Sequence, residues 1–279
     1  YALIAMALVM IFKATTLINF AQGEFAMFGG FIALVLATEQ GIPMWGAVVG
    51  SMVITAVLAA GIERTLIRPF DPADHLPLVI ITLGLFLGIN ALAGIVWRFD
   101  PRAFPELFPS GNALTYGSAT LSWYTVGTMA TIMVVAGGLT LLLNKTKVGL
   151  AFRAVSSNLE SSELVGIKVG PTLQFGWAIA AAVGTLGVCV FVASPFRQLE
   201  PQVMVTGLIF AVSAAALGGL DSLGGAIVGG LAIGLVQSIA VPYLGVPSEL
   251  SLMAAVVVLM LVLLFKPSGL FGTPRVVRV

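Results

Sequence analysis

The side chains that could do chemistry gather in one polar segment, NLESSELVGIKVGP (158–171), near the middle of a strongly apolar sequence. The segment holds two carboxylates, Glu160 and Glu163, among hydroxyl and amide side chains. The single histidine (His75) and the single cysteine (Cys189) exclude a disulfide framework and a Cys/His metal site, and they leave no Ser–His pair for nucleophilic catalysis inside the apolar runs. What remains is the chemistry of docking, in which charged and hydrogen-bonding groups bind another protein.

The composition places the rest of the chain in a membrane. Its 279 residues are 59% hydrophobic and 9% charged, whereas a soluble domain carries about 25% charged residues. So few charges cannot cover a water-facing surface, which predicts an integral membrane protein. The net charge of +1 gives no nucleic-acid footprint. Because an apolar run follows Tyr1 directly, we expect a truncated N-terminus, and a cleaved signal peptide is compatible with what remains.

Nine apolar runs predict membrane helices, since about 20 apolar residues cross a bilayer. The sequence has no alternating ten-residue strands, so the predicted fold is an all-α integral membrane protein, a polytopic bundle of about 8–9 transmembrane helices. No connection resembles a flexible linker, which predicts a single domain over residues 1–279. The expected spans lie near 1–18, 24–38, 44–62, 77–96, 122–143, 173–194, 203–219, 225–241 and 249–265.

Lysines and arginines set the orientation, because cytoplasmic loops carry an excess of them. If the loops 63–76 and 144–172 face the cytoplasm, most basic residues lie inside, every connection alternates correctly and the C-terminus is cytoplasmic. The external loop 97–121 is rich in Pro and Gly and predicts an ordered, irregular lid over helix ends rather than a site. The inside residues are Lys13, Arg64, Arg68, Lys145, Lys147, Arg153, Lys168, Lys266, Arg275 and Arg278, and the outside residues are Arg98, Arg102 and Arg197.

The polar segment carries the signals of a short helix. Ser157 and Glu160 have the spacing of a capping box, with the serine at the N-cap. Gly166 suits the left-handed position that ends a helix. Together these residues predict two helical turns over about 158–165.

Upstream of this helix, apolar residues recur at helical spacing, with Arg153 on another side; they are Leu150, Ala151, Ala154 and Val155. Such a pattern is compatible with an amphipathic linker lying on the membrane. The following short helix is acidic, however, and anionic lipid headgroups would repel it. A protein partner is therefore the better explanation of the whole segment.

Several stretches resemble a known family. Glu160-Ser161-Ser162-x-x-x-Gly166 resembles the EAA-x-x-x-G loop of ABC-importer permeases, with serines in place of the usual alanines. Five motifs in register through nearly the whole chain are similar to permeases of branched-chain amino-acid importers, of the Liv-type H subunit. The similar stretches are TKVGLAFRAVSSN (146–158) with LVGI (164–167), LINFAQGEF (17–25), ERTLIRPF (63–70), ALGGLDSLGGAIVGG (216–230) and KPSGLFG (266–272).

This resemblance implies that the short helix docks into a groove on a cytoplasmic ATPase. The segment 144–172 would then be the ATPase-coupling loop of a single permease domain, in which rim charges steer association and fix register. The residues implied in coupling are Arg153, Ser157, Asn158, Glu160, Ser161, Ser162, Glu163 and Gly166.

The resemblance also implies partners and a location. The partners are a second homologous permease subunit, two cytoplasmic ATPase subunits, a periplasmic or extracytoplasmic substrate-binding protein and the lipid bilayer, with no nucleic acid. The location is the bacterial inner (plasma) membrane, crossed several times. The chain has no G-x-x-x-x-G-K-[ST] phosphate loop. We therefore expect a transport subunit that is not an enzyme and has no cofactor, with ATP and Mg²⁺ on the ATPase subunits.

Polar residues inside the spans are costly and are candidates for a substrate path. Asn19 and Gln22 either cap the second helix, with Glu24 in its first turn, or line the path as a broken helix, and both interpretations stay open. Asn90 needs either an interhelical hydrogen bond or a substrate contact. Gly84 and Gly88 predict close helix packing. The remaining path candidates are Thr82, and Thr206 with Ser213, which share a helix face.

Four functions are compatible with these features, and one is favoured. Ionisable groups are nearly absent from mid-span positions, which disfavours ion coupling. We expect a permease subunit of an ABC importer for branched-chain or hydrophobic amino acids, which couples ATP hydrolysis by separate subunits to inward translocation. The alternatives are a related ABC permease for urea, short amides or aromatic acids, a stand-alone secondary carrier or channel, and, with least support, a membrane enzyme.

Overall fold

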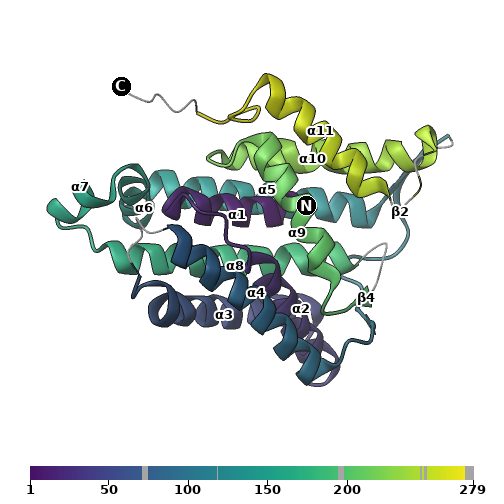
Figure 1. The fold of residues 1–279 in the computed structure, drawn as a ribbon. Coiled ribbons are helices and arrows are strands. Elements are labelled where there is room, and N and C mark those ends of the chain that lie inside the picture. The colour runs from purple at the N-terminus through teal and green to yellow at the C-terminus, as the bar shows by residue number, and fades with distance from the viewer. Residues whose placement is uncertain (71–74, 118, 194–197, 246, 248–249, 274–279) are drawn as a thin grey trace.

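The apolar runs of the sequence form helices that lie side by side, most of them close to parallel or antiparallel (Figure 1). A computed structural model gives the structure of residues 1–70, 75–117, 119–193, 198–245, 247 and 250–273. These residues form α1 (Ala2–Thr15), α2 (Gln22–Thr38), α3 (Met44–Ile62), the π-helix η1 (Glu63–Ile67), α4 (His75–Trp97), β1 (Arg102–Ala103), β2 (Asn112–Tyr116), β3 (Ala119–Ser122), α5 (Trp123–Lys145), α6 (Lys147–Ser157), α7 (Leu159–Leu164), α8 (Val169–Ala193), β4 (Gln198–Leu199), α9 (Val203–Gly218), α10 (Leu223–Leu244) and α11 (Ser251–Phe265).

Each of the predicted spans coincides with a helix, and the span 44–62 has the same bounds as α3. The other apolar helices are shorter than 18 residues over the stretches whose side chains the structure describes, which for α10 is Leu223–Ile239. The all-helical membrane architecture is therefore confirmed, whereas the number of crossings stays a prediction. Among the described residues, four segments are long and apolar enough to cross a membrane, namely Met44–Ile67, Leu76–Trp97, Trp123–Lys145 and Val169–Ala193.

Helix α8 is the most enclosed of these long segments, with 72% of its apolar window buried against 28% for the segment that includes α3. Small residues let its neighbours approach closely, as van der Waals packing between membrane helices requires. A Cβ on Gly187 would lie 2.8 Å from Ile4 of α1, and one on Gly29 of α2 would lie 2.1 Å from Thr185. Thr185 Oγ1 also shares a hydrogen bond of 2.8 Å with Thr55 Oγ1 of α3. α1, α2 and α3 are thus packed around α8.

A second close pair, α9 and α10, packs against α1 as well (Figure 1). A Cβ on Gly229 of α10 would lie only 2.0 Å from the backbone oxygen of Ala214 in α9. After α11 the chain returns to the end of α9, where Leu270 N–H donates to Leu217 O at 2.8 Å. α1 therefore lies between the two packed groups of helices.

Helices α4 and α5 present large apolar side chains outward, and Ile95 and Val134 are 80% and 73% exposed. Such surfaces suit lipid chains or a neighbouring membrane helix. Gly84 and Gly88 were predicted to pack against another helix, but within 4 Å of a Cβ at either position there is only open space among the described residues. This prediction was wrong within the chain, because α4 packs on α2 through its opposite face. There the rings of Trp97 and Phe31 stack with their centroids 4.8 Å apart.

The loop 97–121, which was predicted to be external, is more regular than the sequence indicates. β1 pairs with β4, which lies between α8 and α9, so this short sheet joins two distant connections. β2 and β3 form an antiparallel hairpin with an irregular register near Asn112. The predicted all-α fold therefore needs a small correction outside the apolar helices, because strand pairing there depends on residues far apart in the chain. Arg197, one of the residues used for orientation, lies outside the described residues.

The packing of α10 on α9 gives a first testable prediction. Gly229→Ala would place a methyl group against the Ala214 backbone, which cannot rotate away, so we expect a loss of about 1–3 kcal/mol of stability. The measurement is the thermal unfolding midpoint of the purified protein in detergent. Gly234→Ala is the matched control, because it lies on the same helix with nothing within 4 Å of its Cβ. Equal midpoints for the two variants would contradict the close approach of α9 and α10.

Candidate functional site

The predicted coupling loop 144–172 contains two short helices, α6 and α7, joined at Asn158. Asn158 has an extended backbone (φ −157°, ψ 114°), and its Oδ1 accepts a hydrogen bond from Ser161 N at 2.8 Å. Asn158 is thus the N-cap of α7, and the predicted capping box of Ser157 and Glu160 is wrong. Ser157 is the last residue of α6, so the chain leaves the helical conformation one residue later, where asparagine caps as well as serine does.

Helix α7 ends as the sequence predicts. Gly166 has φ +84°, in the left-handed region. Its N–H donates to Glu163 O at 2.9 Å, and Ile167 N–H donates to Ser162 O at 2.9 Å. These two bonds form a Schellman motif, which satisfies carbonyls at the helix end. The predicted two-turn helix is confirmed, and it is a short unit with hydrogen-bonded caps at both ends.

Helix α6 lies on α8 through an apolar face. Phe152 and Val155 are 1% and 4% exposed, and a Cβ on Gly176 of α8 would lie 2.8 Å from the Phe152 ring. Leu150, which was predicted to share this face, is 61% exposed. The reason is that Leu150 lies about 200° around the helix from Phe152, on which the buried face is centred. Arg153 is exposed, as expected for a residue on another side.

Helix α7 presents charge and apolar surface together. Glu160 and Glu163 are exposed, and the neighbouring Leu164 and Val165 are 88% and 76% exposed. Ser162 is buried instead, and its Oγ donates to a backbone oxygen of the N-cap at 2.7 Å. Exposed apolar side chains rimmed by charges on an ordered helix are typical of a protein-binding surface.

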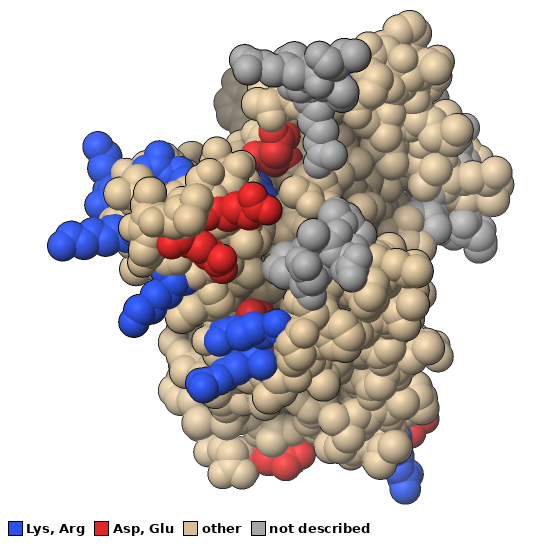
Figure 2. Space-filling view, turned by 60° about the vertical axis from the view of Figure 1, so that its left-hand side comes forward, with Lys and Arg blue, Asp and Glu red and all other residues tan. Residues whose placement is uncertain are grey.

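Charged side chains gather at the end of the molecule that carries α6 and α7. Figure 2 brings this end forward and shows basic and acidic side chains on and around it, beside a broad uncharged surface. The arrangement agrees with the predicted orientation, in which most basic residues lie on the cytoplasmic side. Arg275 and Arg278, which were also assigned to that side, lie outside the described residues.

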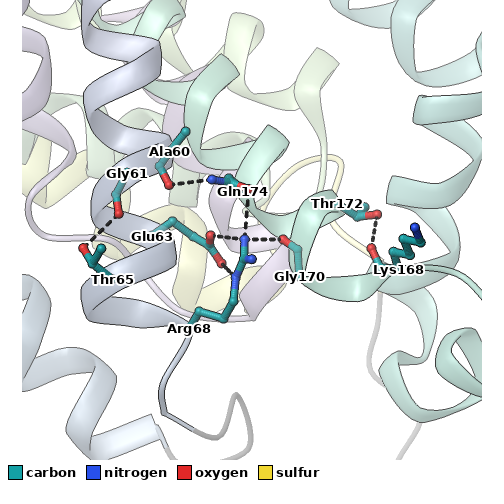
Figure 3. Close-up of polar contacts among 9 residues, drawn as sticks. All are labelled: Ala60, Gly61, Glu63, Thr65, Arg68, Lys168, Gly170, Thr172 and Gln174. Carbon is teal, nitrogen blue, oxygen red and sulfur yellow. Dashed lines mark hydrogen bonds and ion pairs between the residues drawn. The ribbon is translucent and has the colours of Figure 1, made fainter.

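A guanidinium clamp joins the start of α8 to the end of α3 (Figure 3). Arg68 Nη2 lies 2.6 Å from Glu63 Oε2 and donates to Gly170 O at 3.0 Å and to Gln174 Oε1 at 3.1 Å. Gln174 Nε2 donates in turn to Ala60 O at 2.9 Å, which closes the network. Glu63 is 1% exposed, whereas the Arg68 side chain is 31% exposed. A buried carboxylate is thus paired, and two helices that are distant in sequence are joined.

The sequence forms this clamp through a π-helical turn. Arg68 N–H donates to Glu63 O, five residues earlier, at 2.7 Å, and π-turns of this kind are frequent at functional sites. A Cβ on Gly170 would lie 3.2 Å from the guanidinium, so a small residue suits this position. Sequence reasoning missed the clamp, because opposite charges five residues apart do not align on an ordinary α-helix. The available signal was the pair of charges within ERTLIRPF (63–70).

The break between α1 and α2 is buried. Asn19 and Gln22 are 2% and 0% exposed. Asn19 Oδ1 accepts a hydrogen bond from Ala21 N at 3.0 Å, and Gln22 Nε2 donates to Ala180 O of α8 at 2.9 Å. Asn19 Nδ2 and Gln22 Oε1 have no hydrogen-bond partner among the described residues. Asn19 therefore supports the turn before α2, and Gln22 joins α2 to α8.

A buried carboxylate lies next to this break. Glu24 is 0% exposed, and Asn90 Nδ2 donates to Glu24 Oε2 at 3.1 Å and to Pro201 O at 2.9 Å. Asn90 thus forms an interhelical hydrogen bond, one of the two interpretations that the sequence left open. Sequence reasoning placed Glu24 in the first turn of α2 without anticipating its burial, because only the tertiary packing encloses the start of that helix.

The other path candidates are separated in space. Thr82 lines a cavity of about 20 Å³ together with Asn19 and Trp177, which is room for about one water molecule. Thr82 Oγ1 donates to a backbone oxygen of its own helix at 3.0 Å. Ser213 is 2% exposed, whereas Thr206 is exposed. The structure thus brings Asn19 and Thr82 together and leaves Thr206 and Ser213 in different surroundings.

The chain matches a protein family over residues 1–263, and the family is described as "Branched-chain amino acid transport system / permease component". Because the match spans most of the chain, the protein belongs to this family of permease components. Membership confirms the expected resemblance and the prediction of a transport subunit that is not an enzyme.

Individual relatives agree with the family. The high-affinity branched-chain amino acid transport system permease protein BraD of Pseudomonas aeruginosa is 29% identical over 292 residues, covering 100% of this chain and 94% of the relative. LivH of Escherichia coli K12, named as a permease of the same kind, is 27% identical over 291 residues, with 100% and 93% covered. A probable LivH of Methanocaldococcus jannaschii is 27% identical over 284 residues, with 97% and 88% covered.

The clamp predicts that removal of the Arg68 cation alone destabilises the protein more than removal of both charges. Arg68→Gln leaves the buried Glu63 carboxylate without its cation, and we expect a loss of about 3 kcal/mol, at the lower end for buried pairs because the guanidinium is partly exposed. The double variant Glu63→Gln with Arg68→Gln removes both charges, so its loss should be smaller. The measurement is unfolding of the purified protein in detergent.

Arg64→Gln is the matched control for this experiment, because Arg64 is an exposed neighbour on the same turn. It should leave the unfolding midpoint within experimental error of the parent. A double variant as unstable as Arg68→Gln would contradict a charge-pairing role for the clamp.

Proposed function

We propose that this chain is the membrane subunit through which an ABC importer moves branched-chain amino acids into a bacterial cell. The observation that carries the proposal is α7, a capped two-turn helix with exposed Glu160 and Glu163, at the charged end of the bundle. Family membership and the names of the relatives support the substrate class. ATP and Mg²⁺ bind separate ATPase subunits in this proposal.

Coupling would proceed from α7 into the bundle. A short helix with fixed caps transmits a displacement that a flexible loop would absorb. Only residues 165–168 separate α7 from α8, and Arg68 joins the start of α8 to the end of α3. A push on α7 by a closing ATPase dimer would therefore reach two membrane helices at once.

The remaining assignments complete the proposal. The chain acts as one permease domain in the bacterial inner membrane, beside a second homologous permease, two ATPase subunits and an extracytoplasmic substrate-binding protein. The proposed path candidates that lie near the buried break between α1 and α2 are Asn19, Gln22, Thr82 and Asn90. The proposed coupling surface comprises Arg153, Ser157, Asn158, Glu160, Ser161, Glu163 and Gly166, and the buried Ser162 would support it from beneath.

Reversing the charge of α7 tests the docking role. In the complex reconstituted in liposomes, Glu160→Lys with Glu163→Lys should lower ATP-driven leucine uptake about tenfold, the effect of losing about 1.4 kcal/mol of docking energy. Gly166→Val should do the same, because a β-branched residue does not tolerate φ +84° and would disturb the end of α7. Uptake and ATP hydrolysis are measured together.

The matched control carries the same charge change at exposed positions far from α7. Glu39→Lys with Asp100→Lys lies in the predicted external connections and should leave uptake unchanged. Full uptake by the α7 variants, or uptake by the purified chain without ATPase subunits, would contradict the proposed function.

The predicted orientation is tested by thiol labelling. Cys189 is a buried free cysteine, so a new surface thiol dominates the reaction. Ser161→Cys should react with a membrane-impermeant maleimide only after the cells are opened. Tyr116→Cys, at a residue that is 91% exposed in the hairpin β2–β3, should react in intact cells. Labelling of Ser161→Cys in intact cells would place α7 on the wrong side for an ATPase.

A further inference from the structure

A large cavity opens beside the coupling segment, between the end of α1, α6, the α9–α10 turn and the chain after α11. Its volume is about 1070 Å³, and its lining includes Lys13, Ser156, Asp221 and Thr273. Small-molecule sites typically measure about 300–1,000 Å³ and combine apolar walls with a few placed polar groups. The cavity has the mixed lining of such a site and is slightly larger, because it is open on one side.

Two opposite charges line this cavity without neutralising each other. Lys13 lies in the last turn of α1, and within the described residues its ammonium group has no hydrogen bond or ion pair. The Asp221 carboxylate accepts hydrogen bonds from Thr273 N at 3.0 Å and from Thr273 Oγ1, neither of which carries a charge. Each charge is thus available to a ligand group of the opposite sign.

Ser156 lines the same cavity, but its Oγ is enclosed by protein and has no hydrogen-bond partner among the described residues, so this hydroxyl does not face a ligand.

The walls define the rest of the ligand. Phe12, Leu220 and Leu263 line the cavity beside the charged groups. An apolar body with one cationic and one anionic group fits this lining, whereas a nucleotide or inorganic phosphate would meet a carboxylate as well as a lysine. We infer that the cavity binds an α-amino acid with an apolar side chain, its carboxylate toward Lys13 and its ammonium group toward Asp221.

An amino acid bound in this cavity would lie next to the segment that couples the ATPase to the membrane helices. The inference rests on the proposed function, since the amino acid would be the one that the importer releases on the cytoplasmic side. Ser156 lies two residues before Asn158, the N-cap of α7. An amino acid in the cavity would therefore contact the segment that couples the ATPase to the membrane helices.

Ligands that lack one charge test the inference. The full chain in phosphatidylglycerol nanodiscs is titrated calorimetrically with leucine, with isoamylamine, which lacks the carboxylate, and with 4-methylpentanoate, which lacks the ammonium group. We expect the parent to bind leucine about tenfold more tightly than either analogue. Lys13→Met should abolish the preference over isoamylamine alone, and Asp221→Asn should abolish the preference over 4-methylpentanoate alone.

Three variants serve as controls. Lys147→Met removes an exposed lysine of α6 that does not line the cavity, and it should keep both preferences. Asp100→Asn removes an exposed carboxylate that does not line the cavity, so it should also keep both. Lys13→Arg retains the cation and should restore binding if Lys13→Met loses it.

Other outcomes would overturn the inference. The inference would be wrong if the parent and both charge variants showed the same preferences for leucine over its two analogues. It would also be wrong if the parent bound neither leucine nor either analogue. Loss of leucine binding when half of the lipid is replaced by phosphatidylethanolamine would assign the cavity to a zwitterionic lipid headgroup instead. ATP-driven uptake by the complex reconstituted in liposomes tests the proposed function separately. If that complex takes up leucine while the parent and both charge variants show the same ligand preferences, only the cavity site is contradicted.

Discussion

The attachment of α8 at its α7 end is the constraint on which the rest of the structure depends. α8 is the most enclosed of the long helices, and small residues bring α1, α2 and α3 into contact with it. Arg68 joins its start to α3 through charge-assisted hydrogen bonds, which are about twice as strong as neutral ones. Because α7 leaves the bundle a few residues before this point, any force on α7 enters where two helices are already joined.

Polar side chains inside the bundle serve first to join helices. A bilayer offers no water to an unpaired group, so an interruption such as the one between α1 and α2 persists only where protein supplies partners. Gln22 donates a hydrogen bond to α8. Asn90 donates hydrogen bonds to Glu24 and to Pro201, which lies just before α9. Several residues that could contact a substrate are therefore also structural, and a path through this region would use the atoms that remain unpaired.

The two ends of the molecule differ in what they can bind. The end with β1 to β4 carries short strands, which suit a cover over helix ends, together with charges of both signs such as Arg98, Asp100 and Glu106. The opposite end carries the acidic helix α7, the clamp and a cavity with opposite charges. A motor protein and a released amino acid would meet the chain at this same end, and α6 contacts both places.

Local properties of the sequence determined the membrane class, the approximate helices and the end of α7. Apolar run length and the conformation that Gly166 allows depend on neighbouring residues, so they can be predicted from the sequence. Tertiary structure decided the rest. The Asn90–Glu24 bond joins residues 66 apart, and the Arg68–Gly170 bond joins residues 102 apart. The outward position of Gly84 and Gly88 likewise depends on which face of α4 meets α2. Such pairings arise only when the helices pack, since nothing in a local stretch specifies which distant atom will complete a hydrogen bond.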